Sequence, residues 1–157
     1  MNELASPVGF GELVVHSDLF GDLRLAHTDV ISFAGGLLGF PECQRFALIG
    51  GARDGLFWLQ SLDYSALAFL LIDPFSFVGQ YSVDLSPLDI AHLAAEQPSD
   101  VALLTIVTLP RTPGESATTN LQGPLAINMH TRLGKQLVCD GVEYGVRCPV
   151  DLMPAVA

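Results

Sequence analysis

The segment LFWLQSLDYSALAFLLIDP at residues 56–74 contains two short apolar runs separated by a polar turn. The runs at residues 56–62 and 67–72 have strand length, and they are apolar at successive positions rather than at alternate ones. Such runs are typical of central strands that are covered on both faces. Asp73-Pro74 ends the second run, because proline has no N–H to donate to a β-ladder. The segment therefore predicts a closed barrel or a sandwich.

The remaining sequence repeats this pattern of short apolar segments with turn residues between them, which indicates a mainly β, antiparallel protein. Further strands are expected at residues 12–16, 22–26, 30–33, 45–49, 81–85, 101–109, 125–129 and 135–139. Because successive side chains of a strand point to opposite faces, Leu23 and Leu25 should face inward and Arg24 outward. Residues 30–33 are expected to extend the sheet that residues 12–26 form.

Several connections carry turn signals of their own. The glycines within residues 35–39 predict an irregular loop, and residues 110–119 predict a polar loop. Asp140-Gly141 predicts a hairpin turn, since this pair tolerates positive φ angles. In the strand expected at residues 125–129, the side chains of Leu125, Ile127 and Met129 should face inward.

A short helix is predicted after residue 86. Ser86 is a good N-cap, Pro87 occupies the first helical position, and Asp89 lies near the positive end of the helix dipole. The apolar stripe of this helix is expected to comprise Ile90, Leu93 and Ala94. The whole chain is then interpreted as a single compact antiparallel β-barrel-like domain at residues 1–150. The helix covers one end, and residues 151–157 form a flexible tail.

Charge is unevenly distributed along the 157 residues, whose formal net charge is −10. Residues 1–110 contain 13 acidic and 3 basic residues, whereas residues 111–157 contain 4 of each. An anionic surface repels phosphate backbones and attracts cationic proteins. Direct binding of nucleic acid is therefore disfavoured. A cationic protein partner is one explanation of this charge, and solubility alone is the other.

Motifs for catalysis, metals and cofactors are not found in the sequence. The four histidines lie far apart, the three cysteines have no CxxC spacing, and the glycines form neither a dinucleotide nor a phosphate-binding loop. Asp73, which precedes a proline, is expected to cap its own turn rather than to catalyse a reaction. We therefore expect no enzyme, no cofactor and no metal. The aromatic residues around Phe57-Trp58 and the loop acids leave a ligand-binding or enzymatic small β-barrel as the alternative.

The sequence also indicates where the protein is located. The N-terminus has no signal-peptide pattern, and the apolar runs fall short of the ~20 residues of a membrane span, so a cytoplasmic, non-membrane protein is expected.

Apolar loop residues either anchor loops in the core or form an exposed patch for a partner. The candidates for this patch are Leu37, Leu38, Phe40, Phe75 and Phe77.

Three blocks of the sequence, in order, resemble the FliW family of flagellar assembly factors. The first is ISFAGGLLGF at residues 31–40 with RFAL at 45–48, and the second is FWLQSLD at 57–63 with the strand ending in Asp73-Pro74. The third comprises TNLQGPLAIN at residues 119–128, RLGKQ at 132–136 and YGVRCP at 144–149. The resemblance covers about residues 11–150. Ala34, Leu38 and Pro41 depart from the family pattern in the glycine loop.

The resemblance implies an all-β, barrel-like fold that binds two proteins. One is flagellin, the filament subunit, and the other is CsrA, an RNA-binding protein that represses translation of flagellin messenger RNA. In the family, FliW antagonises CsrA until newly made flagellin takes FliW away, so that translation is coupled to flagellin secretion.

The polar and aromatic members of the matching segments are the candidate binding residues. They are Gln60, Asp73, Phe75, Asn120, Arg132, Tyr144 and Arg147. Asn120 could instead satisfy loop backbone groups, and Arg147 could pair with a nearby acid.

Overall fold

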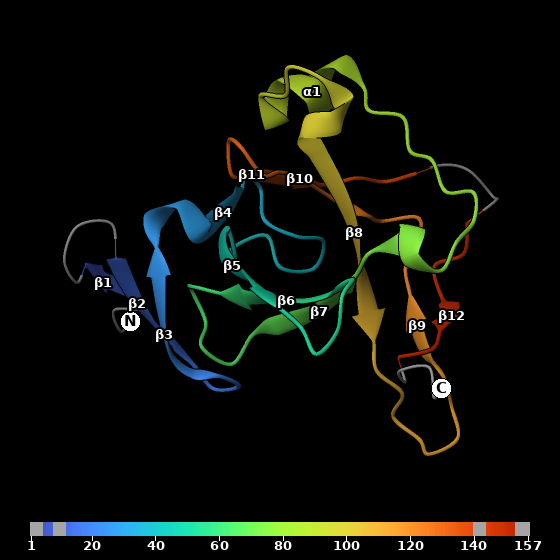
Figure 1. Ribbon diagram of the computed structural model, residues 1–157, viewed down its shortest axis with the longest axis horizontal. Coiled ribbons are helices and arrows are strands. Elements are labelled where there is room, and N and C mark those ends of the chain that lie inside the picture. Colours follow the sequence, from blue (N-terminus) through green and yellow to red (C-terminus); the bar gives the residue numbers. More distant parts are fainter. Residues whose placement is uncertain (1–4, 8–11, 140–143, 153–157) are drawn as a thin grey trace.

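The computed structural model describes residues 5–7, 12–139 and 144–152, and it forms a closed β-barrel with a small sheet beside it (Figure 1). The barrel strands are β4 (Val30–Phe33), β5 (Arg45–Gly50), β6 (Leu56–Ser61), β7 (Ala68–Ile72), β8 (Val101–Thr108), β10 (Leu125–Asn128) and β11 (Leu133–Gln136). Their order is β10-β11-β4-β5-β6-β7-β8, and the pairing of β8 with β10 closes the ring. Neighbouring strands are antiparallel except for β11 and β4, which are parallel. The predicted barrel is confirmed.

The barrel interior is filled with apolar side chains. The buried residues of this core are Ile31, Phe33, Leu37, Cys43, Phe46, Leu59, Leu71, Leu104, Leu125 and Ile127. The outer face of β6 and β7 is covered too, because Leu56, Leu70 and Ile72 pack with residues of the neighbouring strands. Burial on both faces explains why these two strands are apolar at successive positions.

The small sheet contains β1 (Ala5–Pro7), β2 (Glu12–Ser17) and β3 (Gly21–Ala26) in sequence order. Leu23 and Leu25 are half-buried and Arg24 is exposed, as the alternation predicts. The prediction that residues 30–33 extend this sheet is wrong. The 3₁₀-helix η1 (His27–Asp29) redirects the chain, and β4 then pairs with β5 and β11 inside the barrel.

Strands β9 (Ala117–Thr119) and β12 (Cys148–Val150) lengthen the wall beside β8. Residues 110–119 were expected to form a polar loop, but the last three of them form β9, in which Thr118 and Thr119 pair with β8. Thr119 is buried, and its hydroxyl donates to the Ile106 carbonyl at 2.8 Å, so its polar group is satisfied inside the wall. Short polar residues can thus occupy a strand when their hydroxyls find backbone acceptors.

Helix α1 (Pro87–Leu93) begins as predicted, with Ser86 and Asp89 forming a capping box. It lies beside the end of the barrel where β8 begins (Figure 1). Only part of the predicted stripe is correct, because Leu93 is buried against Ala126 and Leu137 whereas Ile90 is exposed. Within the described residues, no helix is long and apolar enough to span a membrane.

Three other segments differ from the prediction or lie outside the described residues. Residues 81–85 form no strand, because Val83 and Leu85 hold this segment by side-chain packing rather than by a backbone ladder. Met129 does not face inward, since it follows the end of β10 in an exposed turn. Asp140-Gly141 and residues 153–157 of the predicted tail lie outside the described residues.

Candidate protein-binding site

One end of the barrel is closed by the glycine loop at residues 35–39. Leu37 is only 2% exposed and belongs to the barrel core. The Phe40 ring packs edge-on against Phe69 with 5.3 Å between ring centroids. Gly36 has a φ of 70°, and a Cβ there would lie 2.5 Å from the Phe40 carbonyl oxygen, so this close approach requires glycine. Of the predicted patch residues in this loop, Leu37 is therefore an anchor in the core, whereas Phe40 remains 36% exposed beside Phe69 and Leu38 is exposed.

The opposite end of the barrel opens into an apolar groove of about 390 Å³. Its lining comprises Leu48, Phe57, Asp73, Phe75, Val101, Ala102, Leu103, Leu104 and Met129. Leu48 and Phe57 pack against the barrel core but are only partly buried, so the groove exposes the edge of that core. A cleft of this size and apolar lining lies within the range of binding sites, about 300–1,000 Å³.

Phe75 forms one rim of the groove and is 54% exposed. It lies in the 3₁₀-helix η2 (Pro74–Ser76), whose N-cap is Asp73. The Asp73 carboxylate accepts a hydrogen bond from the Phe75 N–H at 2.9 Å, which confirms the predicted capping role. The Phe75 ring then packs edge-on against Tyr81, with 5.7 Å between centroids. An exposed aromatic side chain is thus held in a fixed position, which lowers the entropy that binding would cost.

An aromatic cluster extends from this rim toward the C-terminal part of the chain. Tyr81 packs against Tyr144 with 4.7 Å between ring centroids, and its hydroxyl donates to the Leu121 carbonyl at 2.7 Å. Burial raises the pKa of Tyr81, so this hydroxyl stays protonated as a donor. The Tyr144 hydroxyl accepts from the Ser82 N–H at 3.0 Å. These contacts tie the segment after η2 to the loops at residues 120–122 and 144–145.

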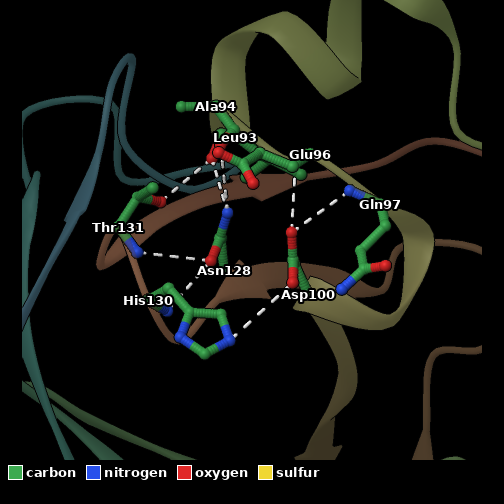
Figure 2. Close-up of polar contacts among 8 residues, drawn as sticks. All are labelled: Leu93, Ala94, Glu96, Gln97, Asp100, Asn128, His130 and Thr131. Atoms are coloured by element: carbon green, nitrogen blue, oxygen red, sulfur yellow. Dashed lines mark hydrogen bonds and ion pairs between the residues drawn. The ribbon is translucent and has the colours of Figure 1, made fainter.

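Met129 forms the other rim and is 41% exposed. Its turn is anchored to the C-terminal end of α1, as Figure 2 shows. The Asn128 amide and the Thr131 hydroxyl both donate to the Leu93 carbonyl, at 3.0 and 2.9 Å. These bonds satisfy a carbonyl that the helix itself leaves free.

A second contact in Figure 2 joins the same turn to the residues before β8. His130 lies 3.7 Å from Asp100, whose carboxylate also accepts hydrogen bonds from the N–H groups of Glu96 and Gln97. Partial desolvation opposes ionisation of Asp100, but these hydrogen bonds outweigh it and lower its pKa. Asp100 thereby fixes the backbone immediately before β8, a strand that lines the groove.

The structure brings some of the predicted site residues together and separates others. Asp73 and Phe75 line the groove, and Tyr144 belongs to the adjoining aromatic cluster. Asn120 lies next to that cluster, where its side-chain oxygen accepts from the Gln122 N–H at 3.0 Å. Arg132 lies on the Met129 side, with a φ of 60° and a hydrogen bond to the Asp29 carbonyl.

Gln60 and Arg147 occupy different environments. Gln60 is 0% exposed, accepts from the Ser17 hydroxyl at 2.7 Å, and donates to backbone carbonyls of the β6–β7 turn. It has no surface to offer a partner, and it joins the small sheet to the barrel instead. Arg147 is exposed, just before β12.

The sequence did not identify the groove lining itself. Leu48, Phe57 and Leu103 resemble ordinary strand residues, and Met129 was expected in the core. No local signal distinguishes a core residue from one at the mouth of a barrel, because the difference depends on where neighbouring strands end. In the part of the chain that the structure describes, no group of His, Cys, Asp or Glu could hold a metal ion.

The fold and this groove define a small, mainly antiparallel β-barrel protein with one closed end and one open apolar end. Comparison with known proteins identifies the family. The family description "FliW protein" matches residues 14–150, and the chain belongs to the FliW family.

Individual relatives are similar in sequence to this chain over most of their length. The chain is 36% identical to the flagellar assembly factor FliW of Natranaerobius thermophilus over 87% of this chain and 91% of the relative. It is 37% identical to that of Geobacillus thermodenitrificans, over 79% and 85% respectively. A crystal structure of the flagellar assembly factor FliW superposes with a TM-score of 0.79 at 33% identity, covering 92% of this chain and 99% of the other.

Proposed function

We propose that this chain is a cytoplasmic flagellar assembly factor that acts by binding two proteins, flagellin and CsrA, and that it catalyses no reaction. The relatives named as flagellar assembly factors support the role in flagellum biogenesis. The observation that carries the binding mode is the open apolar end of the barrel, where Phe75 and Met129 are exposed on rigid supports. Fixed, exposed aromatic and methionine side chains are typical anchors of protein interfaces.

The proposed cycle depends on competition between the two partners. Unoccupied, the chain binds CsrA and relieves repression of flagellin translation. Newly made flagellin then binds the chain and frees CsrA to repress again, and secretion of flagellin resets the cycle. An interface of about 800 Å² per partner would suffice for each complex.

Charge supports CsrA as one of the partners. An RNA-binding protein carries a cationic surface, because it must neutralise phosphates. This chain has a net charge of −10. Opposite net charge increases the rate of association and disfavours simultaneous binding of RNA nearby. The chain alone is expected to have no measurable affinity for RNA at physiological salt.

The ligand-binding or enzymatic barrel is less well supported. The inside of the barrel is occupied by side chains such as Phe33, Phe46 and Leu59, which are fully buried. The carboxylate that lines the open groove, Asp73, is engaged in capping η2. Neither arrangement offers converging acid and base groups of the kind that catalysis requires.

Reconstituted translation tests the proposal. The reaction contains a flagellin transcript whose translation is repressed by added CsrA from the same organism. Adding this chain should restore translation. Adding purified flagellin as well should restore repression. Size-exclusion chromatography should show one complex with each partner and none with both. Failure to co-elute with either partner at micromolar concentration would refute the proposal, and so would binding to the transcript itself.

A further inference from the structure

Strand β8 continues beyond the end of its neighbour β7. The last pair between them is Ile72 with Thr105, after which β7 stops. The four earlier residues of β8, Val101 to Leu104, pair with β10 on the other side only. The barrel wall therefore has an open seam along this part of β8, and the apolar groove lies over it.

The backbone of Leu103 faces this seam. The Ile106 carbonyl accepts from the Asn120 N–H, so the backbone groups of Ile106 point away from β7. Backbone groups alternate in direction along a strand, and therefore those of Leu103 point toward the β7 side. The burial of Leu104 and Ile106 toward the core, with Leu103 packed outside, shows that this alternation is regular.

Pro74 prevents β7 from closing the seam. Continuing the register by two residues would place Pro74 opposite Leu103. Proline has no N–H to donate. Its carbonyl is also occupied, since it accepts from the N–H groups of Phe77 and Val78 at 3.3 and 2.9 Å. Among the described residues, the Leu103 N–H and C=O thus have no hydrogen-bond partner.

The surroundings of this free edge are mainly apolar, and their charges are divided between the two rims: the Arg132 guanidinium lies 3.9 Å from the Met129 sulfur, whereas Asp73 lies on the Phe75 side. Leu48, Phe57 and Leu104 form the floor, and Phe75 and Met129 form the rims. The sequence contains no lysine or arginine between Arg53 and Arg111, although this stretch carries Asp54, Asp63, Asp73, Asp84, Asp89, Glu96 and Asp100. Asp73 and Asp84 form no ion pair within the described part of the chain. An occupant is therefore favoured if it is apolar and carries its cations on the side of Asp73 and Asp84, away from Arg132.

We propose that this seam is a docking site for an extended segment of a protein partner, which pairs with β8 at Leu103. Alternate side chains of the segment enter the groove and are apolar, and the others face the acidic surface and include lysine or arginine. The main-chain bonds fix the register, while contacts with Phe75 and Met129 supply most of the affinity. This inference rests on the proposed function, which supplies the partners.

An amphipathic helix lying across the groove is the main competing occupant. It would contact Phe75 and Met129 but would leave the Leu103 N–H exposed to water, because its own backbone is already hydrogen-bonded. Protection of this one amide therefore separates the two modes.

Amide hydrogen exchange measured by NMR tests the inference, with flagellin and CsrA from the same organism as separate probes. In the free protein, the Leu103 amide should exchange faster than those of Ala102 and Leu104, which face β10. Saturation with one of the two probes should slow exchange at Leu103 at least tenfold. A bound complex in which the Leu103 amide remains unprotected would overturn the inference and leave the proposed function intact.

A pair of charge variants makes the test independent of exchange. Met129→Lys places a cation at the groove rim and should weaken binding of the same probe about tenfold or more. Leu88→Lys is the control, since Leu88 is 61% exposed on α1 and does not line the groove. Equal loss in both variants would overturn the inference. Failure of both probes to bind the wild-type chain would instead remove the proposed function, and this inference with it.

Discussion

The two ends of the barrel contain similar apolar residues but present them differently. At the closed end, the glycine loop folds Leu37 into the core and packs the partly exposed Phe40 ring edge-on against Phe69. At the open end, Pro74 turns the chain into η2, which leaves Phe75 exposed and the core residue Phe57 only partly covered. The closed end thus completes the core, whereas the open end leaves apolar side chains exposed that a bound partner can bury.

This difference separates residues that should control stability from residues that should control binding. A substitution at the closed end or in the core is expected to lower the free energy of unfolding and leave the affinity of the folded protein unchanged. A substitution at the open rim is expected to do the reverse.

The largest effect is expected for Phe46→Ala. The Phe46 ring is fully buried and packs edge-on against Phe33 at 5.6 Å between centroids. Its loss should reduce the free energy of unfolding by about 3–5 kcal/mol, because a cavity is left in the core. Urea unfolding followed by tryptophan fluorescence measures this. Phe75→Ala is the matched control, and a comparable loss there would contradict the separation of the two ends.

Gln60→Ala is expected to be nearly as damaging. Removal of its amide would leave the Ser17 hydroxyl and the carbonyls of Ser65 and Leu67 without this partner in a buried position. The free energy of unfolding should fall by about 1–3 kcal/mol. The affinity of the folded variant for flagellin and CsrA should equal that of the wild type. A specific loss of affinity without loss of stability would show that Gln60 acts at an interface after all.

Gly36→Ala tests the tight turn at the closed end. Both the positive φ and the contact with the Phe40 carbonyl oppose a side chain there. Gly114 also has a positive φ, of 91°, but a Cβ at that position would meet no atom within 4 Å. Both variants should lose about 1 kcal/mol from the positive φ alone. Thermal unfolding should show a clearly larger loss for Gly36→Ala, and equal losses would mean that the loop packs less tightly than described.

The smallest effect is expected from pH. Desolvation opposes ionisation of Asp89, but hydrogen bonds from Lys135, at 2.7 Å, and from Ser86 outweigh it and lower the pKa of Asp89. Its stabilisation is therefore fully present above the unfolded-state pKa of about 3.9 and is lost as the pH falls through the lower folded-state pKa.

Asp89→Asn should accordingly reduce the difference in unfolding free energy between pH 7 and pH 3, by less than about 1 kcal/mol. Asp84→Asn is the control, because Asp84 is exposed and forms no ion pair in the described part of the chain. An Asp89→Asn variant with unchanged pH dependence would show that the contact with Lys135 contributes nothing to stability.

Much of the fold could be predicted because its signals are local. Continuous apolar runs identified β6 and β7, and the sequence from Ser86 to Asp89 identified the start of the helix. The errors concern how elements meet. Residues 30–33 were assigned to the wrong sheet, because a strand does not encode its partner and η1 redirects the chain before it.

The candidate site was predictable only in part for the same reason. Asp73 and Phe75 were identified from the matching segments, and the structure places both at the groove. Leu103 carries no signal in its own residue type. Its free backbone groups arise because Pro74 ends a strand that is 29 residues earlier in the chain, and only the register of β7 with β8 relates the two.

Two variants, each of which truncates an exposed side chain at one end of the barrel, test most directly whether the chain binds its partners through the open end. Phe75→Ala removes the open rim, and Leu38→Ala removes a side chain that is 64% exposed in the glycine loop. Isothermal titration with flagellin and with CsrA should show Phe75→Ala weakened at least tenfold toward one or both partners, and Leu38→Ala within about twofold of wild type. Wild-type affinity of Phe75→Ala for both partners, or a loss confined to Leu38→Ala, would contradict this account.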